Sequence, residues 1–296
     1  MGARDYERLS VEDFGEQTIL SRDLDPVYCA LVDAELDPVV LRRWLVAYWC
    51  FYDCGVASWM SELKGEKFWG QMAIAATNAV PSPIGDRWRR AAERRHFRGA
   101  QAEKAIVSLR DTYRDRPQTM VDYCFYGHTG EIHVPTGGGT VTSTCADVMK
   151  LAKEHRGFGD WIGFKVADML ERVVGYKVNF SSAEIFMFDD PRKGAIRVFR
   201  EKGLIPEGAV IRKDRENAII EEVVAFLIKK FRHLKAPPRD DRLIDLQEVE
   251  TVLCKWKSHM NGHYPLRNDI DEIMEKTAPW AEICETAKKF REAMPA

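Results

Sequence analysis

The chain has 296 residues, of which 45% are apolar and 30% are charged. This composition is sufficient for one large folded core or two smaller ones. The 44 basic and 46 acidic side chains leave a formal net charge of −2. That balance excludes a uniformly basic protein that coats nucleic acid, but it allows a local basic face.

Seven cysteines occur without a CxxC pair, so neither a disulfide framework nor a structural zinc site is expected. The segment Met1–Ser10 is charged and lacks the apolar run of a signal peptide. No window approaches the roughly 18–20 apolar residues that span a bilayer. We therefore expect a soluble protein of a reducing cytoplasm, with no metal, no cofactor and no membrane contact.

Helical periodicity dominates the first part of the chain. Pro38 opens an almost wholly apolar helix that we expect to run through Val56, and a second helix follows at 68–77. A long charged helix is predicted over 87–113, with an apolar stripe that begins at Ala102. Pro117 then starts a short helix.

The segment 126–142 differs in kind, because glycines flank alternating apolar residues. This pattern predicts a small β-hairpin or loop insertion. The triple glycine at 137–139 invites comparison with a phosphate-binding loop, but the Lys-Ser or Lys-Thr pair of such a loop does not follow it. A flexible connector is the better interpretation.

Further helices are predicted at 146–155, 160–174, 182–186, 191–201, 215–232, 246–260 and 279–293. Strands and helices do not alternate as they do in a parallel sheet, so the predicted class is all-α. We expect a single domain over 1–296, with the helices of 245–293 packed on the rest.

The strongest local signal is a predicted helix–hairpin–helix at 146–174, in which two glycines surround one apolar residue between two helices. Phe158 is expected to anchor the turn, while Gly157 and Gly159 present backbone amides to DNA. Unpaired amides at the start of the second helix favour a phosphate, and Lys165 adds a charge. A tight helix–helix turn, with glycine serving only as a cap, is the alternative.

Two groups of basic residues accompany this hairpin in the sequence. Arginine side chains bind phosphate and pyrophosphate oxygens through two parallel hydrogen bonds. The alternative interpretation is a solvated helix face. The first group comprises Arg87, Arg89, Arg90, Arg94, Arg95, His96 and Arg98, and the second comprises Arg192, Lys193, Arg197 and Arg200.

Adjacent carboxylates and one tryptophan complete the candidates. Asp190 is expected to cap the next helix, which leaves Asp189 to act as a base or to orient an amine. Trp256 belongs to a helix whose lysine, cysteine and aromatic side chains cannot all face the core. It is therefore a candidate for stacking on an exposed base, with simple packing as the alternative.

Several stretches together resemble the phage amino acid:DNA transferases. That group is related to the α-glutamyl/putrescinyl thymine pyrophosphorylases and to the helical domain of the hydroxymethyluracil DNA kinases. The resemblance covers most of 24–264 and implies a helix–hairpin–helix DNA glycosylase fold in a phage protein of the host cytoplasm. The stretches are Leu41–Ser61, Glu93–Gly99, Gly157–Val173, Phe186–Lys193 and Glu250–Tyr264.

The resemblance also implies a reaction, in which the amine of an amino acid displaces pyrophosphate from 5-(pyrophosphoryloxymethyl)uracil within DNA. The partners are then DNA and a small amino acid or amine, with functional coupling to a hydroxymethyluracil DNA kinase. The modified base must leave the helix stack. Aromatic side chains of the first apolar helix are expected to be mostly core, with a pocket wall as the alternative; they are Trp44, Tyr48, Trp49 and Tyr52.

This reaction assigns provisional roles to the candidate residues. A base must accept the proton of the ammonium, and positive charge must stabilise the leaving pyrophosphate. The catalytic candidates are Asp189, Lys165 and His155. The candidates for substrate and pyrophosphate binding are Arg94, Arg95, His96, Arg98 and Trp256, and those for DNA binding are Gly157, Phe158, Gly159, Arg192 and Lys193.

One departure from the glycosylase pattern disfavours base excision. A glycosylase places an aspartate after the hairpin, where it stabilises an oxocarbenium cation. Here that region holds Asn179, and no carboxylate occurs before Glu184. Two rival hypotheses remain, namely a glycosylase that uses Asp189 or Asp190 and a non-catalytic DNA-binding subunit.

Overall fold

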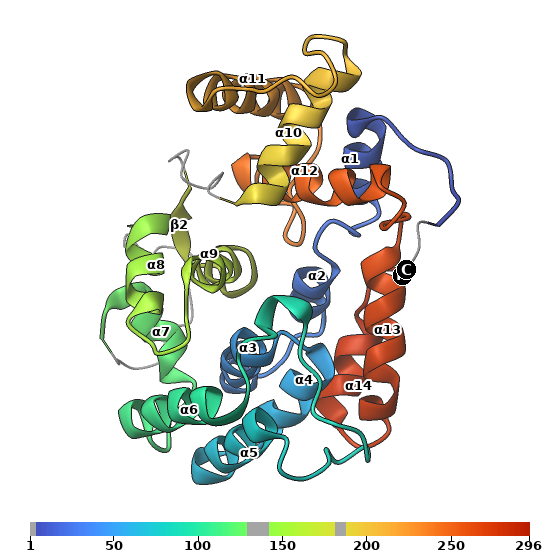
Figure 1. Ribbon diagram of the computed structural model, residues 1–296. Helices are drawn as coiled ribbons and strands as arrows, with labels where there is room; N and C mark the ends of the chain where they lie inside the picture. Colours follow the sequence, from blue (N-terminus) through green and yellow to red (C-terminus); the bar gives the residue numbers. More distant parts are fainter. Residues whose placement is uncertain (1–3, 129–141, 181–187) are drawn as a thin grey trace. The chain divides into compact units, whose positions relative to one another are not determined.

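The computed structural model describes residues 4–128, 142–180 and 188–296 (Figure 1). This part of the chain is mostly helical, which confirms the predicted all-α class, and it adds one pair of three-residue strands. Among these residues, no helix combines the length and the apolar character needed to cross a membrane. All seven cysteines have free thiols.

The chain separates into two compact units. The terminal unit comprises residues 1–29, 180–271 and 295–296, and the central unit comprises 30–179 and 272–294. Two helices, α2 and α13, run across the division. Their bounds are Pro26–Asp33 and Asn268–Ala281.

The central unit holds most of the described elements. Its α-helices are α3 (Pro38–Phe51), α4 (Cys54–Glu62), α5 (Gly65–Thr77), α6 (Gly99–Tyr113), α7 (Thr119–Tyr126), α8 (Cys145–Lys153), α9 (Asp160–Met169) and α14 (Glu285–Glu292). A 3₁₀ turn, η1 (Ala92–Arg94), and a π-helical turn, η2 (Leu170–Val174), join them, together with strands β1 (Thr142–Thr144) and β2 (Lys177–Asn179).

The helix that was expected to run from Pro38 through Val56 is two helices. Tyr52 ends α3 with φ 52° and ψ 41°, in the left-handed region. Asp53 then caps α4, because its side chain accepts a hydrogen bond from the backbone N–H of Val56 at 2.9 Å. An aspartate with extended backbone is a strong N-cap, and this local signal overrides the continuous apolar pattern.

The segment 87–98 is also not helical, contrary to the expectation of one helix over 87–113. It contains only η1, and the helix begins at Gly99. The reason lies in the sequence. The apolar stripe through which α6 packs on the core starts at Ala102, and residues 87–98 do not continue this stripe toward the N-terminus. The arginines of this segment therefore lie on a loop that includes η1, and residues 87–98 are called the arginine loop.

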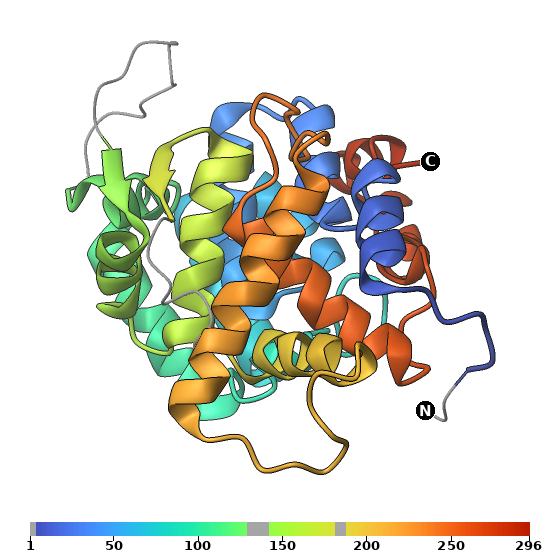
Figure 2. The ribbon, with the colours of Figure 1, turned by 90° about the horizontal axis from the view of Figure 1, so that it is seen from above.

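The two short strands belong to the central unit and are parallel, pairing Thr142 with Lys177 and Thr144 with Asn179 (Figure 2). The predicted hairpin or loop insertion at 126–142 lies mostly outside the described residues. The predicted helix at 182–186 lies outside them entirely.

The terminal unit is built around α10, α11 and α12, which pack on one another and on α1 (Figure 1). A Cβ on Gly194 of α10 would clash with the backbone carbonyl of Leu253 in α12, so only glycine permits this close approach. The bounds are α1 (Val11–Leu20), α10 (Asp189–Glu201), α11 (Lys213–Phe231) and α12 (Leu246–Met260).

Two expectations about helix ends need correction. Asp190 does not cap α10, because the N-cap residue is Phe188 and no side chain bonds there. Pro279 does not begin the last helix, since it lies inside α13, and α14 starts only at Glu285. A proline pattern alone cannot distinguish the first turn of a helix from a position within one.

Candidate active site

Helices α8 and α9 are joined by a short turn over residues 154–159, and these two helices with their turn are called the hairpin. The two helices pack on each other, and Gly157 adopts φ 84°, which favours glycine. Gly159 is the N-cap residue of α9, and no side chain caps this helix. The amides of its first turn have no partner within the helix, and the dipole favours an anion there. Gly157 and Gly159 are both exposed.

The apolar residue between the two glycines is buried. The side chain of Phe158 is 6% exposed, and its ring lies 5.8 Å from that of His155. The guanidinium of Arg94 lies 5.4 Å from the centre of the Phe158 ring. The side chain of Phe158 therefore anchors the turn, while Gly157 and Gly159 on either side of it are exposed.

Arg94 is a buried connection between three parts of the central unit. From η1, its Nε donates to the carbonyl of Cys50 at 3.0 Å and its Nη1 donates to the carbonyl of Gly157 at 3.0 Å. The side chain is 7% exposed, and burial lowers its pKa. These bonds fix the end of α3, the arginine loop and the hairpin relative to one another.

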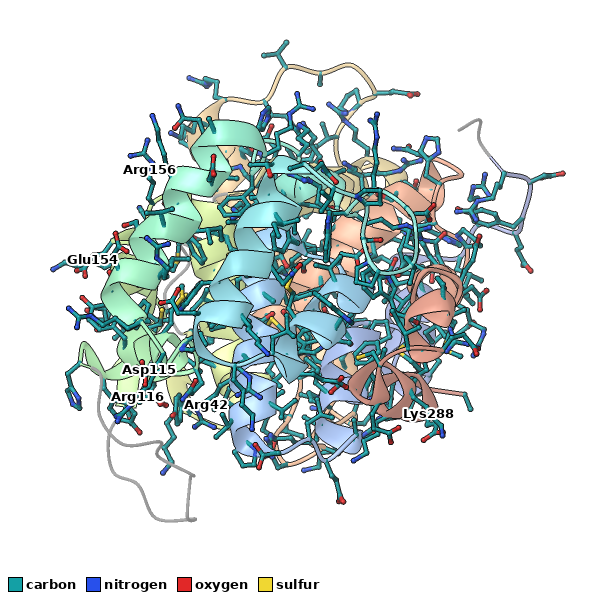
Figure 3. The ribbon with its side chains drawn as sticks, turned by 90° about the horizontal axis from the view of Figure 1, so that it is seen from below. Arg42, Asp115, Arg116, Glu154, Arg156 and Lys288 are labelled. Atoms are coloured by element: carbon teal, nitrogen blue, oxygen red, sulfur yellow. The ribbon has the colours of Figure 1, made fainter. Side chains whose placement is uncertain are left out.

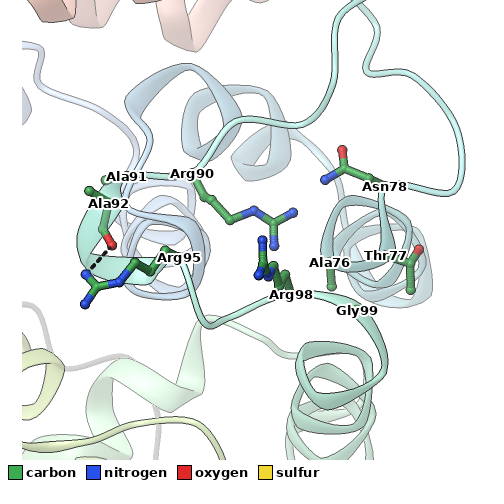
Figure 4. Close-up of a pocket in the computed structure, with 9 residues that line it drawn as sticks. All are labelled: Ala76, Thr77, Asn78, Arg90, Ala91, Ala92, Arg95, Arg98 and Gly99. Carbon is green, nitrogen blue, oxygen red and sulfur yellow. Dashed lines mark hydrogen bonds between the residues drawn. The ribbon is translucent and has the colours of Figure 1, made fainter. Parts of the chain in front are cut away.

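A pocket of about 640 Å³ opens beside this connection (Figure 4). Three arginine side chains line it, namely Arg90, Arg95 and Arg98. The remaining lining residues are Ala76, Thr77, Asn78, Ala91, Ala92 and Gly99, so no carboxylate is among the nine. Such a lining suits an anion with several oxygens.

The positive charges of Arg90 and Arg98 oppose each other within this pocket. Burial, followed by the positive charge of Arg98, lowers the pKa of Arg90. Arg90 is held in place by hydrogen bonds to the carbonyls of Ala75, at 3.0 Å, and Phe97. Arg95 and Arg98 are exposed, and the two guanidinium groups of Arg90 and Arg98 face each other in Figure 4. A bound anion would relieve this repulsion.

The other predicted residues of the central unit have different surroundings. His96 is exposed on the arginine loop but does not line the pocket. His155 is buried, with Nε2 2.5 Å from the hydroxyl of Tyr113 and Nδ1 3.0 Å from the carbonyl of Ala152. Burial lowers the pKa of His155. These contacts favour a structural role.

Lys165 lies on α9, one turn after Trp161. Its Nζ is 3.8 Å from a carboxylate oxygen of Asp168 and its side chain is mostly buried. The ammonium also lies 5.2 Å from the centre of the Phe164 ring. Both of these contacts are to residues of α9, and Lys165 lies in the middle of that helix.

Asp189, Arg192, Lys193 and Trp256 belong to the terminal unit. Asp189 begins α10 with its side chain 82% exposed, and it pairs with Lys193 at 3.2 Å. Arg192 pairs with Glu216 at 2.9 Å. Trp256 is 1% exposed and its Nε1 donates to the carbonyl of Leu9 at 3.0 Å, which favours packing.

The structure thus brings together Arg95, Arg98 and the hairpin within one unit. Sequence reasoning passed over two basic residues of this region. Arg90 stood in the basic run but was not singled out, although it lines the pocket. Arg156, labelled with Glu154 in Figure 3, is exposed directly before Gly157 and donates to Gln101 at 2.9 Å. In the sequence, its place directly before Gly157 could have indicated that Arg156 lies beside the exposed turn.

Comparison with known proteins identifies the family. A model of the amino acid:DNA transferase family matches residues 19–263. The chain is 47% identical over 301 residues to a glycinyltransferase of Pseudomonas phage PaMx11, and the match covers 99% of this chain and 98% of that protein. It is 25% identical over 276 residues to a putrescinyltransferase of Delftia phage PhiW-14, covering 92% and 79% of the two chains.

The family match spans both compact units and includes the arginine loop, the hairpin and α10. It agrees with the resemblance carried by the sequence motifs of these segments. The chain is therefore a transferase and belongs to the amino acid:DNA transferase family.

Proposed function

We propose that the chain transfers glycine onto 5-(pyrophosphoryloxymethyl)uracil in DNA, with release of pyrophosphate. The family supports transfer of an amino acid to DNA, and the relative that is 47% identical is named a glycinyltransferase. The observation that carries the proposal is the pocket lined by Arg90, Arg95 and Arg98 without a carboxylate. Pyrophosphate is a polyanion whose oxygens match such a lining.

In the proposed step, the amine nitrogen of glycine attacks the methylene carbon attached to C5 of the uracil. The bond between that carbon and the pyrophosphate oxygen breaks, and pyrophosphate leaves with the electron pair. The new secondary ammonium loses one proton to a base. The arginines would stabilise the charge that develops on the leaving oxygen, which is where fixed cations contribute most.

The predicted role of Asp189 as the proton acceptor stays a hypothesis; its exposed carboxylate pairs with Lys193. Lys165 is proposed to add positive charge near the substrate. The buried contacts of His155 and Arg94 support positioning roles for these two residues. His96 and Trp256 keep their predicted substrate-binding roles only as hypotheses.

For DNA binding we propose that α8, the turn and α9 act as a helix–hairpin–helix in a glycosylase-like domain that extends over 1–296. The exposed turn and the uncapped start of α9 support a phosphate contact there. Gly157 and Gly159 would supply backbone amides to a DNA phosphate. Arg192 and Lys193 would supply further contacts to the DNA backbone. A hydroxymethyluracil DNA kinase is the class of enzyme that would supply the substrate.

The test is mass spectrometry of nucleosides from duplex DNA that carries 5-(pyrophosphoryloxymethyl)uracil. The DNA is incubated with the full chain and isotopically labelled glycine, with putrescine and other amino acids in parallel reactions. A labelled glycine adduct together with equimolar pyrophosphate supports the proposal. Abasic sites would instead support a glycosylase, and unchanged nucleosides with retained binding would support a DNA-binding subunit.

A further inference from the structure

The corner between α3 and α4 carries an aromatic residue in an unusual backbone conformation. Tyr52 adopts φ 52° and ψ 41° at the end of α3. This left-handed region is unfavourable for a residue with a Cβ and is more often occupied by glycine or asparagine. Such conformations persist where the surrounding structure enforces them, and they cluster at functional sites.

A row of aromatic rings holds Tyr52 in place. Along α3, the ring centres of Trp44 and Tyr48 are 4.6 Å apart and those of Tyr48 and Tyr52 are 4.3 Å apart. Trp44 and Tyr48 are buried, whereas Tyr52 is half-buried. The row therefore begins in the core and reaches the surface at Tyr52.

The surface end of this row meets the hairpin. The rings of Tyr52 and Trp161 lie 4.8 Å apart at 65°, in an edge-to-face arrangement. Trp161 is the second residue of α9 and is half-buried. The aromatic pair is thus attached to the same first turn whose amides have no side-chain cap.

The same connection that fixes the arginine loop also fixes this pair. Arg94 bonds the carbonyls of Cys50 and Gly157, which lie two residues before Tyr52 and four before Trp161. Ala91, which lines the arginine pocket, donates its N–H to the carbonyl of Phe51 at 3.1 Å. These hydrogen bonds therefore connect the segments of the central unit that carry the aromatic pair and the cationic pocket.

We propose that Tyr52 and Trp161 form the surface on which the extruded pyrimidine stacks while its pyrophosphate is held by the arginines. This inference rests on the proposed function, because it takes the modified uracil as the ligand. A base removed from the duplex loses its stacking, and a half-exposed aromatic pair replaces it. Stacking of this kind changes affinity by roughly 5- to 150-fold per base.

The test separates base extrusion from chemistry. A duplex is made with one 5-(pyrophosphoryloxymethyl)uracil and 2-aminopurine as its 3′ neighbour, whose fluorescence rises when the modified base leaves the stack. No amine is added, so transfer cannot proceed. We expect Trp161→Leu and Tyr52→Leu to lower the fluorescence increase and to weaken binding by roughly 10-fold, within the range for aromatic stacking.

Two variants control for loss of packing. Trp161→Phe keeps an aromatic ring and should restore most of the signal. Trp59→Leu removes a half-buried tryptophan that packs on Trp88 and Trp280 elsewhere in the central unit, and it should leave the signal unchanged. Thermal unfolding of each variant identifies any that fail to fold.

The outcomes are distinguishable from failure of the proposed function. If the unaltered chain transfers glycine but Trp161→Leu keeps the full fluorescence increase and full affinity, the stacking role is wrong and the function stands. A fluorescence increase with Trp161→Leu as large as that with Trp161→Phe would also overturn the stacking role. If the unaltered chain extrudes the base, Trp161→Leu lowers this signal and no adduct forms with any amine, the stacking role stands and the proposed transfer is wrong.

Discussion

Nη1 of Arg94 donates a hydrogen bond to the carbonyl of Gly157 at 3.0 Å, which connects the arginine loop to the hairpin. The carbonyl of Cys50 accepts a second bond from the same guanidinium. The sequence predicted that Arg94 binds pyrophosphate, but these two bonds are the contacts of a residue that stabilises the fold. The exposed neighbours Arg95 and Arg98, together with Arg90, are left to line the pocket.

Replacing Arg94 should therefore destabilise the protein. In Arg94→Met, the two carbonyls lose their partner while most of the side-chain volume remains. Loss of buried, charge-assisted hydrogen bonds predicts a decrease of about 2–4 kcal/mol in the free energy of unfolding. Urea denaturation measures it, with Arg95→Met as the matched control, because Arg95 is exposed and one residue away. Equal stability of the two variants would contradict this role.

The pocket arginines should affect activity rather than stability. We expect Arg98→Gln to lower kcat/KM for transfer on the order of 10- to 100-fold, since one cation near the leaving group is lost. It should also weaken inhibition by added pyrophosphate. Arg87→Gln, at an exposed position of the same loop that does not line the pocket, should leave both quantities unchanged. Identical kinetics for the two variants would place the pyrophosphate elsewhere.

The elements that the sequence predicted best were those with a complete local signal. Helix α12 has the predicted bounds, and α10 begins within two residues of its expected start. The errors arose where one signal hid another. The apolar run from Trp44 to Val56 concealed the cap at Asp53, and the density of arginines after Asp86 concealed the absence of an apolar stripe.

In the candidate site, too, only features that depend on neighbouring residues in the sequence could be predicted. The turn between α8 and α9 could be predicted because its glycines and flanking helices are local in sequence, whereas its role as a DNA-binding helix–hairpin–helix stays a prediction. The burial of Arg94 and His155 could not, because it depends on partners distant in sequence, namely Cys50, Gly157 and Tyr113. The pairing of Tyr52 with Trp161 likewise joins positions that only the fold brings together. The expectation of one domain over 1–296 stays a prediction.

The two glycines of the hairpin should respond differently to alanine. At Gly157, φ is 84° and a Cβ would lie 3.1 Å from the Phe97 ring, so Gly157→Ala should cost about 1–2 kcal/mol of stability. At Gly159 a Cβ meets nothing within 4 Å, so Gly159→Ala should leave stability within about 0.5 kcal/mol.

A bulkier change at Gly159 tests the DNA contact directly. Gly159→Val adds volume over the exposed turn, and it should weaken binding to duplex DNA if the backbone approaches a phosphate there. Fluorescence anisotropy at several salt concentrations measures the affinity, and thermal unfolding confirms the fold. Gly70→Val is the control, because Gly70 also has open space around its Cβ but lies on α5, away from the hairpin turn. Unaltered affinity for Gly159→Val would argue against this phosphate contact.

Stability of the terminal unit should depend on pH through Asp23. The side chain of Asp23 is fully buried; one carboxylate oxygen accepts the N–H of Arg267 at 2.7 Å, and Lys255 and Asp269 are nearby charges. Burial raises the pKa of Asp23 from 3.8 to about 6, and the positive charge of Lys255 opposes this only in part. Between these two values the folded protein binds more protons than the unfolded chain.

Because the folded protein binds more protons in this pH range, its free energy of unfolding decreases as the pH rises. The free energy of unfolding contributed by Asp23 is largest below about pH 4 and falls as the pH rises toward the folded pKa of about 6, after which it is constant. The full change is about 3 kcal/mol, because one pKa unit corresponds to about 1.4 kcal/mol.

Asp23→Asn keeps the shape but cannot titrate, so its unfolding free energy minus that of the unaltered chain should increase between pH 4 and pH 7. Urea denaturation across this range measures the difference, and a flat difference curve would show that Asp23 does not titrate there. Asp240→Asn is the matched control, because it makes the same change at an exposed carboxylate of the same unit.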